Sequence, residues 1–283
     1  MANRTVFKVY NETKEQLKNA GVKDFGFEAR VIIKHITGFD NKKVILNYNA
    51  VLSDEQEKEL ENIISRRITG YPLQYIIGKW GFYGLEFIVG EGVLIPRADT
   101  ETLVETGLDL IKGVKDPSVL DLCAGSGAIG ISIAVNRGDS NVLLLEKFET
   151  AFSYLNENIK LNNVDNAEAF KGDVLKGDCS DRKFDLIISN PPYIKSAEIK
   201  YLEREVKCEP LSALDGGSDG LNFYRAIINN YKGALKSGGK ICFEVGINQS
   251  EIVDEMLNIS GFEDIKTVKD YGGIDRVVFG TVK

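Results

Sequence analysis

The 283-residue chain contains only one histidine and four cysteines, and each scarcity argues against a kind of site. His35 stands among apolar neighbours in a helical pattern, where a structural or surface histidine is expected more often than a catalytic one. The cysteines form no Cys-x-x-Cys pair, so the sequence predicts neither a zinc site nor a disulfide framework and favours a reducing cytoplasm. They are Cys123, Cys179, Cys208 and Cys242.

Long apolar runs and excess positive charge are also missing. No run of about 18 apolar residues occurs, and the N-terminus lacks an apolar signal core, so neither membrane spanning nor export is expected. The 35 Lys and Arg residues against 42 Asp and Glu give a formal net charge of −7, which repels polyanions. We interpret the only dense basic cluster, Arg66, Arg67 and Lys79, as a solvated helix face, and direct nucleic-acid binding is therefore not expected.

The length and the hydrophobic pattern predict two domains and a connector. Apolar residues recur at helical spacings over residues 1–78, where Ser53 and Gln56 form a capping-box pattern. Aromatic and β-branched residues around glycines predict a β-hairpin connector over residues 79–96. Apolar strands then alternate with helical stretches over residues 97–283, which indicates an α/β fold with a mostly parallel sheet and an antiparallel hairpin at its C-terminal end.

A glycine-rich turn follows the first strand of this α/β region. Gly125, Gly127 and Gly130 have the spacing Gly-x-Gly-x-x-Gly, which lets the backbone turn tightly and approach a nucleotide-like ligand. Glu146 ends the next strand, where a carboxylate can accept both hydroxyl protons of a ribose. These residues fit a nicotinamide dinucleotide as well as S-adenosylmethionine.

Two acids favour S-adenosylmethionine. Asp121, at the carboxyl end of the first strand, would repel a pyrophosphate but attract an ammonium group, which the methionine end of this cofactor carries. Asp173, after the third strand, is expected to bond the adenine amine, with Val174 packing on the ring. The expected contacts in the glycine-rich loop are Cys123, Ala124, Gly125, Ser126 and Gly127.

The segment Asn-Pro-Pro-Tyr at 190–193 stands at the end of the predicted strand FDLIISN, at the edge where such folds bind ligands. The Asn190 side-chain oxygen and the Pro191 carbonyl can accept the two N–H groups of a planar nitrogen substrate. The rings of Pro191 and Pro192 hold these acceptors still, and Tyr193 is expected to cover one face of the planar group. No general base is needed, because a sulfonium is a strong leaving group.

Together with the glycine-rich loop, these four residues resemble the amino-group methyltransferases of the class I S-adenosylmethionine-dependent fold. The chain is similar over nearly its whole length to the protein-glutamine methyltransferases that modify peptide chain release factors, the HemK/PrmC family. The segments that carry this likeness are residues 66–78, 81–87, 94–101, 208–225 and 270–276.

The resemblance implies a Rossmann-like methyltransferase sheet and S-adenosylmethionine as cofactor, with S-adenosylhomocysteine as product. It also implies that the substrate is the glutamine of a Gly-Gly-Gln loop in a release factor, docked by the N-terminal helical domain. The chain departs from the family pattern at Ala98, where proline is common, and at Ala124, where threonine is common. The alternatives are methylation of a ribosomal-protein glutamine, methylation of an exocyclic base amine in DNA or RNA, and a docking factor without catalysis.

Overall fold

The computed structural model describes residues 4–39 and 41–283, which form two compact units. The smaller unit comprises the chain up to Gly78 together with Glu203–Cys208, and the larger comprises Lys79–Leu202 and Glu209–Lys283. Within the described residues, no helix is both long and apolar enough to cross a membrane.

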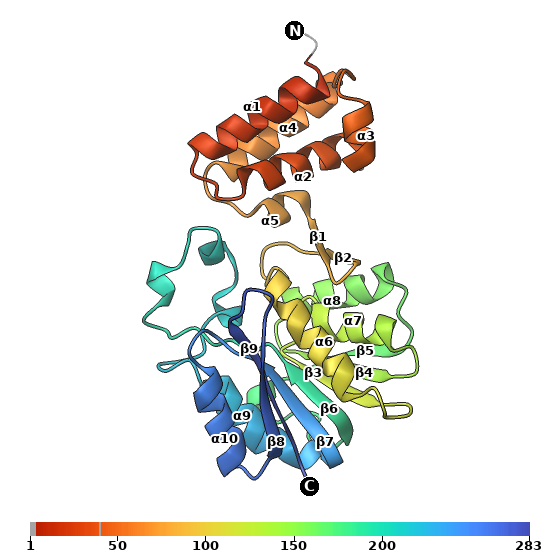
Figure 1. Ribbon diagram of the computed structural model, residues 1–283, viewed down its shortest axis with the longest axis vertical. Helices are drawn as coiled ribbons and strands as arrows, with labels where there is room; N and C mark the ends of the chain where they lie inside the picture. Colours follow the sequence, from red (N-terminus) through yellow and green to blue (C-terminus); the bar gives the residue numbers. More distant parts are fainter. Residues whose placement is uncertain (1–3, 40) are drawn as a thin grey trace. The chain divides into compact units, whose positions relative to one another are not determined.

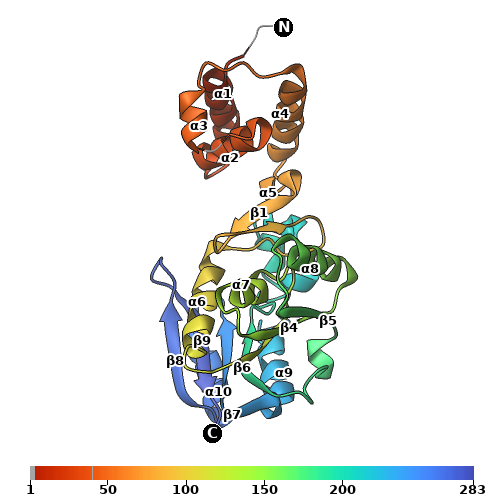
Figure 2. The same cartoon turned by 90° about the vertical axis from the view of Figure 1, so that its right-hand side faces the viewer.

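The smaller unit consists of helices (Figure 2). Its own core is made of aliphatic side chains, mainly from α1, α2 and α4. At the start of α4, the Ser53 hydroxyl accepts from the Gln56 backbone N–H, and the Gln56 side chain accepts from the Ser53 N–H. This geometry confirms the predicted capping box. The helices are α1 (Val6–Asn19), α2 (Phe25–Thr37), α3 (Asn41–Leu46), α4 (Asp54–Arg67) and α5 (Leu73–Ile77).

The interpretation of Arg67 as part of a solvated helix face is wrong. Its side chain is only 2% exposed, whereas that of its neighbour Arg66 is exposed. The Arg67 guanidinium donates to both carboxylate oxygens of Glu28, at 2.6 and 2.8 Å, and to Glu205 at 2.6 Å. A guanidinium buried in this way is compensated by bidentate, charge-assisted hydrogen bonds, and its partners lie too far away in the sequence for local spacing to reveal them.

The larger unit begins with a two-stranded antiparallel hairpin, β1 (Lys79–Phe82) and β2 (Leu85–Ile88). Tyr83 and Gly84 form its turn with φ values of 49° and 75°. Two consecutive positive φ values are typical of the turn type that matches the twist of paired strands. The structure confirms the predicted hairpin, although its second strand ends at Ile88 and residues 89–96 continue without strand structure.

A seven-stranded sheet of order β5-β4-β3-β6-β7-β9-β8 forms the centre of this unit (Figure 1). The strands from β5 to β7 are parallel, and β9 pairs antiparallel with both β7 and β8. This confirms the predicted sheet and its C-terminal hairpin. The strands are β3 (Ser118–Leu122), β4 (Asn141–Glu146), β5 (Ala167–Lys171), β6 (Phe184–Ser189), β7 (Leu235–Glu244), β8 (Glu263–Lys269) and β9 (Asp275–Thr281).

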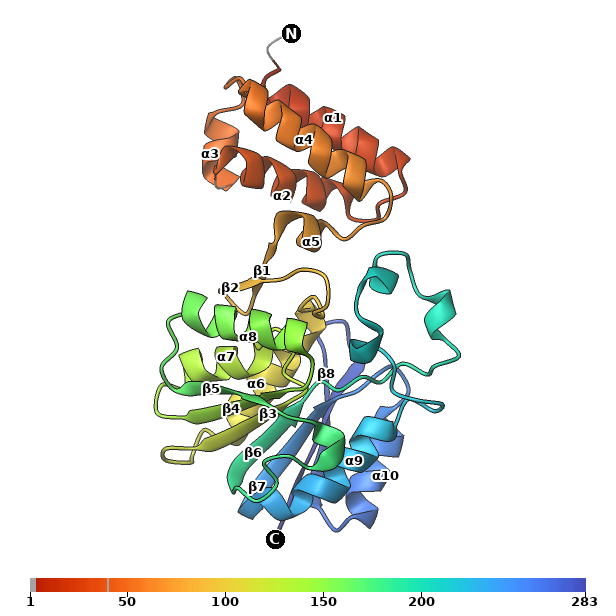
Figure 3. The ribbon, with the colours of Figure 1, turned by 180° about the vertical axis from the view of Figure 1, so that it is seen from behind.

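Helices cover both faces of the sheet, with α6, α7 and α8 on one face and α9 and α10 on the other (Figures 1 and 3). Because side chains alternate along a strand, the β3 residues Leu120 and Leu122 join the core under α9, whose Tyr224 packs edge-to-face on Phe243 at 5.4 Å. The helices are α6 (Glu101–Leu110), α7 (Ala128–Asn136), α8 (Glu149–Leu161), α9 (Asn222–Tyr231) and α10 (Ser250–Ile259). Short 3₁₀ helices are η1 (Ala98–Thr100), η2 (Val174–Lys176), η3 (Ile199–Tyr201), η4 (Val206–Cys208), η5 (Leu211–Ala213) and η6 (Lys232–Ala234).

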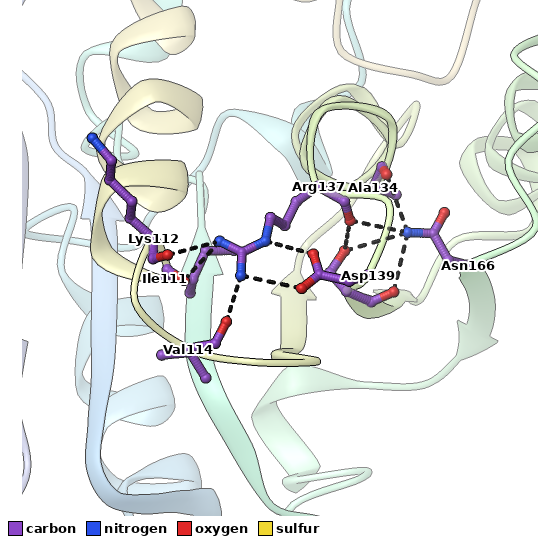
Figure 4. A network of polar contacts seen from close by, with 8 residues as sticks. Ile111, Lys112, Val114, Ala134, Arg137, Asp139 and Asn166 are labelled. Carbon is purple, nitrogen blue, oxygen red and sulfur yellow. Dashed lines mark hydrogen bonds and ion pairs between the residues drawn. The ribbon is translucent and has the colours of Figure 1, made fainter.

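A polar network joins the chain segments that follow α6 and α7 (Figure 4). The Arg137 guanidinium donates to the backbone carbonyls of Ile111 and Val114 and pairs with Asp139. The Asn166 amide donates to three carbonyls around the end of α7, including that of Arg137. These bonds satisfy loop carbonyls next to the amino ends of β4 and β5. The carboxyl ends of the strands lie at the opposite edge of the sheet.

Candidate active site

A cavity opens at the carboxyl ends of β3, β4, β5 and β6. The chain order reverses between β3 and β6, and this reversal is where parallel α/β sheets bind ligands. Leu122 and Ser189 face each other at the ends of these two strands, and the Ser189 hydroxyl donates to the Leu122 carbonyl at 2.6 Å. The last residues of β4 and the loops after all four strands line the cavity with residues 123–126, 145–148, 172–175, 190 and 192. Residues 92–94, 96, 97 and 100 line it as well, as do residues 210, 212, 213, 215 and 223.

The loop after β3 adopts the conformation that its glycines permit. Gly127 has a φ of 83° at the N-terminal end of α7, and a Cβ there would lie about 2.5 Å from Leu155 Cδ1. Cys123 also has a positive φ, of 60°, which is uncommon for a residue with a side chain. Burial raises the pKa of its thiol, so Cys123 is held as a neutral group in the cavity wall. The predicted contacts Ala124, Gly125 and Ser126 line the cavity beside it.

Glu146 stands at the end of β4 with its carboxylate at the cavity wall. One carboxylate oxygen accepts from the Gly125 N–H at 2.9 Å and the other from the Phe148 N–H at 2.8 Å. Burial raises the pKa of Glu146, and these backbone donors act in the opposite direction. The side chain is therefore fixed, and each oxygen keeps a second lone pair for a ligand hydroxyl.

Asp121 is fully buried and does not itself line the cavity. Its Oδ2 accepts from the Gly130 N–H at 2.9 Å, and its Oδ1 has no hydrogen-bond partner within the described chain. Burial is the main cause that raises the pKa of Asp121 to about 8. The predicted ammonium partner is thus a buried acid whose ionisation a nearby cation would favour.

Asp173 and Val174 lie in the loop after β5. Asp173 Oδ1 accepts from the Leu175 N–H at 3.0 Å, and Oδ2 pairs with the Lys147 ammonium at 3.0 Å. Burial raises the pKa of Asp173, but these two partners outweigh that effect and keep it below its ordinary value. Val174 is buried and contributes an apolar surface to the cavity.

Asn190 lines the cavity directly after β6, and its Nδ2 donates to the Thr100 hydroxyl oxygen at 3.3 Å. The Tyr193 carbonyl accepts from Gln249 Nε2 at 2.9 Å, and a Cβ at Gly220 would collide with that carbonyl. Gln249 also accepts from the Gly246 N–H at 3.0 Å. A side-chain clamp and a close glycine therefore hold the Asn-Pro-Pro-Tyr backbone in place.

Pro191 and Pro192 are both buried, and Pro192 lines the cavity. The Tyr193 ring is not among the lining side chains, and its hydroxyl donates to Glu244 at 3.4 Å. Burial raises the pKa of Tyr193 well above its ordinary value, so the phenol remains a donor. The placement of this ring over a substrate stays a prediction.

Sequence reasoning missed several residues of the cavity. Thr100 lies in a segment that carried the resemblance, but nothing in its spacing marks it as a partner of Asn190. Arg97 also lines the cavity and pairs with the buried carboxylate of Glu209, whose other oxygen accepts from the Ile95 N–H at 3.1 Å. Ala124 is buried in the cavity wall, whereas Ala98 is exposed at the start of η1.

The fold and the site define a methyltransferase of the Rossmann-like class. Two family models match the chain, described as the PrmC N-terminal domain over residues 8–78 and the methyltransferase small domain over residues 100–206. Among solved structures, a methyltransferase from Pyrococcus furiosus is similar with a TM-score of 0.52 and 19% identity, covering 81% of this chain and 98% of that one. The hMettl16 catalytic domain is similar with a TM-score of 0.58 and 16% identity, covering 83% and 86% of the two chains.

Curated relatives identify the family within this class. A release factor glutamine methyltransferase from Thermodesulfovibrio yellowstonii is 42% identical over 89% of this chain and 90% of its own. Proteins with the same name are 38% identical in Fusobacterium nucleatum, over 95% of this chain and 77% of the relative, and 37% identical in Geobacter sulfurreducens, over 98% and 97%. The chain belongs to the release factor glutamine methyltransferase family.

Proposed function

We propose that this chain transfers a methyl group from S-adenosylmethionine to the side-chain amide nitrogen of the glutamine in the Gly-Gly-Gln motif of peptide chain release factors. The observation that carries the proposal is the hydrogen bonding of the Asn190 side-chain amide. Its Nδ2 is engaged by Thr100, so its Oδ1 is the end of the amide that is left to receive a donor in the cavity. A primary amide has two N–H donors, which match this oxygen and the Pro191 carbonyl.

The residues around the cavity fit S-adenosylmethionine. When bound, this cofactor supplies a methyl group on a positively charged sulfur, and loss of that charge drives the transfer. Glu146, already fixed by two backbone N–H groups, would accept both ribose hydroxyls. Asp121 is buried behind the cavity wall, so it would act on the ammonium group of the cofactor through its charge rather than by direct contact. Asp173 and Val174 would hold the adenine by its amine and its face.

The acceptors orient the substrate rather than deprotonate it. With both N–H groups held in the plane of the amide, the nitrogen lone pair is presented perpendicular to that plane, toward the methyl group. Pro191 and Pro192 fix φ on either side of the acceptor carbonyl, so little ordering entropy is lost when the substrate binds. The product amide then loses its extra proton to solvent.

We further propose that residues 1–78 form the domain that docks the release factor, followed by a connector over 79–96 and the methyltransferase domain over 97–283. The separate helical core and the match to the PrmC N-terminal domain support this division. A chain lacking residues 1–78 should keep its affinity for S-adenosylhomocysteine and show a much higher KM for the release factor. An unchanged KM in a truncated protein that still binds cofactor would contradict the docking role.

Methylation assays with three substrates test the proposed activity: a release factor, a ribosomal protein and a nucleic acid. We expect methyl transfer to the release factor, which a substitution of its Gly-Gly-Gln glutamine abolishes. Asn190→Ala should lower kcat by about 100- to 1,000-fold, the usual cost of one preorganised contact at a reacting centre, and leave cofactor affinity within about tenfold. Asn229→Ala, on the exposed face of α9, is the matched control. Wild-type turnover by a folded Asn190→Ala protein, or methylation of the nucleic acid alone, would refute the proposal.

A further inference from the structure

Arg97 is a basic residue of the cavity wall that the expected cofactor contacts do not use. Its side chain is 41% exposed and lines the cavity. The other basic residue of the lining, Lys147, pairs with Asp173 next to the place expected to hold the adenine. Within the part of the chain that the structure describes, the Arg97 guanidinium has Glu209 as its only hydrogen-bond partner. A guanidinium has five N–H donors, so several remain for a ligand.

Glu209 fixes the position of the Arg97 side chain. The Glu209 side chain is only 1% exposed, and one of its carboxylate oxygens accepts from Arg97 Nη2. The other oxygen accepts from the Ile95 N–H at 3.1 Å, so Glu209 holds this segment by its backbone as well. Leaving a buried carboxylate without its cation is costly, which keeps the pair closed. The guanidinium is therefore held in the cavity wall before any ligand arrives.

Backbone contacts place Arg97 at the end of the cavity that contains Asn190. The Thr100 N–H donates to the Arg97 carbonyl at 3.1 Å, and the Thr100 hydroxyl accepts from Asn190 Nδ2 at 3.3 Å. The residues expected to hold the ribose and the adenine lie instead at the end of β4 and in the loop after β5. Arg97 is thus on the side of the cavity proposed to receive the substrate glutamine.

The charges of the lining favour a neutral acceptor as the ligand of Arg97. Arg97 and Glu209 together carry no net charge, and the lining also contains the acids Glu146, Asp173 and Asp215. A carboxylate bound at Arg97 would add a further negative charge to this cavity. A peptide carbonyl adds no charge and accepts a charge-assisted hydrogen bond from a guanidinium.

We propose that Arg97 donates to a main-chain carbonyl of the substrate loop beside the methylated glutamine, and that Glu209 is the positioning residue for Arg97. The inference rests on the proposed function, because a glutamine side chain that enters the cavity brings its own backbone with it. The two glycines before that glutamine have no side chains to shield their carbonyls. In this arrangement Asn190 recognises the amide, and Arg97 recognises the peptide that carries it.

Arg97→Lys tests the contact while keeping a cation beside Glu209. It replaces the planar fork of donors by a single ammonium group, which cannot serve Glu209 and a substrate carbonyl in the same geometry. The KM for a release factor should rise by about 10- to 100-fold, as expected for loss of a charged hydrogen bond, with kcat within about threefold. The Kd for S-adenosylhomocysteine should be nearly unchanged. A raised Kd for S-adenosylhomocysteine with an unchanged KM for the release factor would overturn the proposal and assign Arg97 to the cofactor.

The matched control is Arg225→Lys, because Arg225 forms an exposed ion pair with Asp219 and is not among the lining residues. It should change neither constant. Glu209→Gln tests the positioning role, since it removes the charge at nearly constant shape. It should raise the same KM without lowering kcat, and combining it with Arg97→Lys should cost no more than the larger single effect. Additive losses in a folded double variant would refute the coupling.

A change in the substrate makes the test independent of how the variants fold. In peptides that contain Gly-Gly-Gln, the carbonyls of the two glycines and the glutamine can be replaced one at a time by a thiocarbonyl, a weaker acceptor. One replacement should raise the KM of the wild type and have a much smaller effect in Arg97→Lys. Equal effects in both proteins, or none, would overturn this inference and leave the proposed function standing. A wild-type chain that methylates no release factor would overturn the proposed function, and this inference with it.

Discussion

Replacing Glu146 by glutamine tests the cofactor site with the smallest change of shape. In the structure both carboxylate oxygens already accept a backbone N–H, at 2.8 and 2.9 Å, so the group cannot rotate to adapt. The NH₂ group of Glu146→Gln would have to face one of these N–H donors. The substitution therefore removes one acceptor oxygen, which is shared by one backbone N–H and one ribose hydroxyl.

The expected loss of affinity follows from the charged hydrogen bond to the ribose. Such a bond contributes about 1.5–3 kcal/mol, which corresponds to a rise in the Kd for S-adenosylhomocysteine of roughly 10- to 150-fold. Calorimetric titration with S-adenosylhomocysteine measures this directly. Glu149→Gln removes the same charge three residues away, from an exposed side chain, and should leave the Kd nearly unchanged.

A ligand variant makes the test specific to the hydroxyl groups. An S-adenosylhomocysteine analogue without the ribose 2′-hydroxyl should bind the wild type more weakly, and Glu146→Gln should cost less with this analogue than with the full ligand. A Kd for Glu146→Gln within twofold of the wild type would refute the ribose assignment. An identical loss with both ligands would show that the substitution acts through the loop backbone instead.

Three further predictions concern a buried ion pair, the backbone of the Asn-Pro-Pro-Tyr segment and the buried acids. Arg67→Leu should destabilise the protein by about 3 kcal/mol, because it strips a buried ion pair of its cation, whereas Arg66→Leu should have little effect in the same denaturant titration. Gly220→Ala should lower kcat sharply while melting stays cooperative, since its Cβ would displace the Asn-Pro-Pro-Tyr backbone; unchanged kcat would contradict the clamp. The cofactor-free protein should lose stability as the pH rises from about 5 to 8, because the raised pKa values of Asp121 and Glu244 mean that the native state binds more protons than the unfolded state. Asp121→Asn should flatten this slope in thermal melts, and a wild-type slope of the opposite sign would contradict the assignment.

The strongly patterned elements of the fold could be predicted from the sequence. Strands β3, β4 and β6 are buried on both faces and are therefore nearly continuous apolar runs. Strand β5 is less obvious, because it lies at the sheet edge and its sequence Ala-Glu-Ala-Phe-Lys is only partly buried. The hairpin turn at 271–273 predicts the pairing of β8 with β9, but not that β9 is the strand that pairs with β7.

The contacts that shape the site depend on residues far apart in the sequence. Asn190 and Thr100 are 90 positions apart, and Arg67 meets Glu205 across 138 positions. Local spacing identifies Asn190 as a candidate because Asn-Pro-Pro-Tyr is a short motif, but it contains no information on what holds the side chain. The same limit explains why Arg67 was assigned to a solvated face: its charge is visible in the sequence, and its acidic partners are not.

The distribution of buried acids accounts for the presence of an amide, rather than a carboxylate, after β6. Asp121, Glu146 and Glu244 lie at the carboxyl ends of β3, β4 and β7, and burial raises the pKa of each. Burial disfavours the charged forms of these acids in the empty protein, and a cationic cofactor would favour their ionisation. A further carboxylate at position 190 could also accept the substrate N–H groups, but it would stabilise the sulfonium charge that methyl transfer must disperse. Under the proposed function, the neutral oxygen of Asn190 would orient the substrate amide without adding to this barrier.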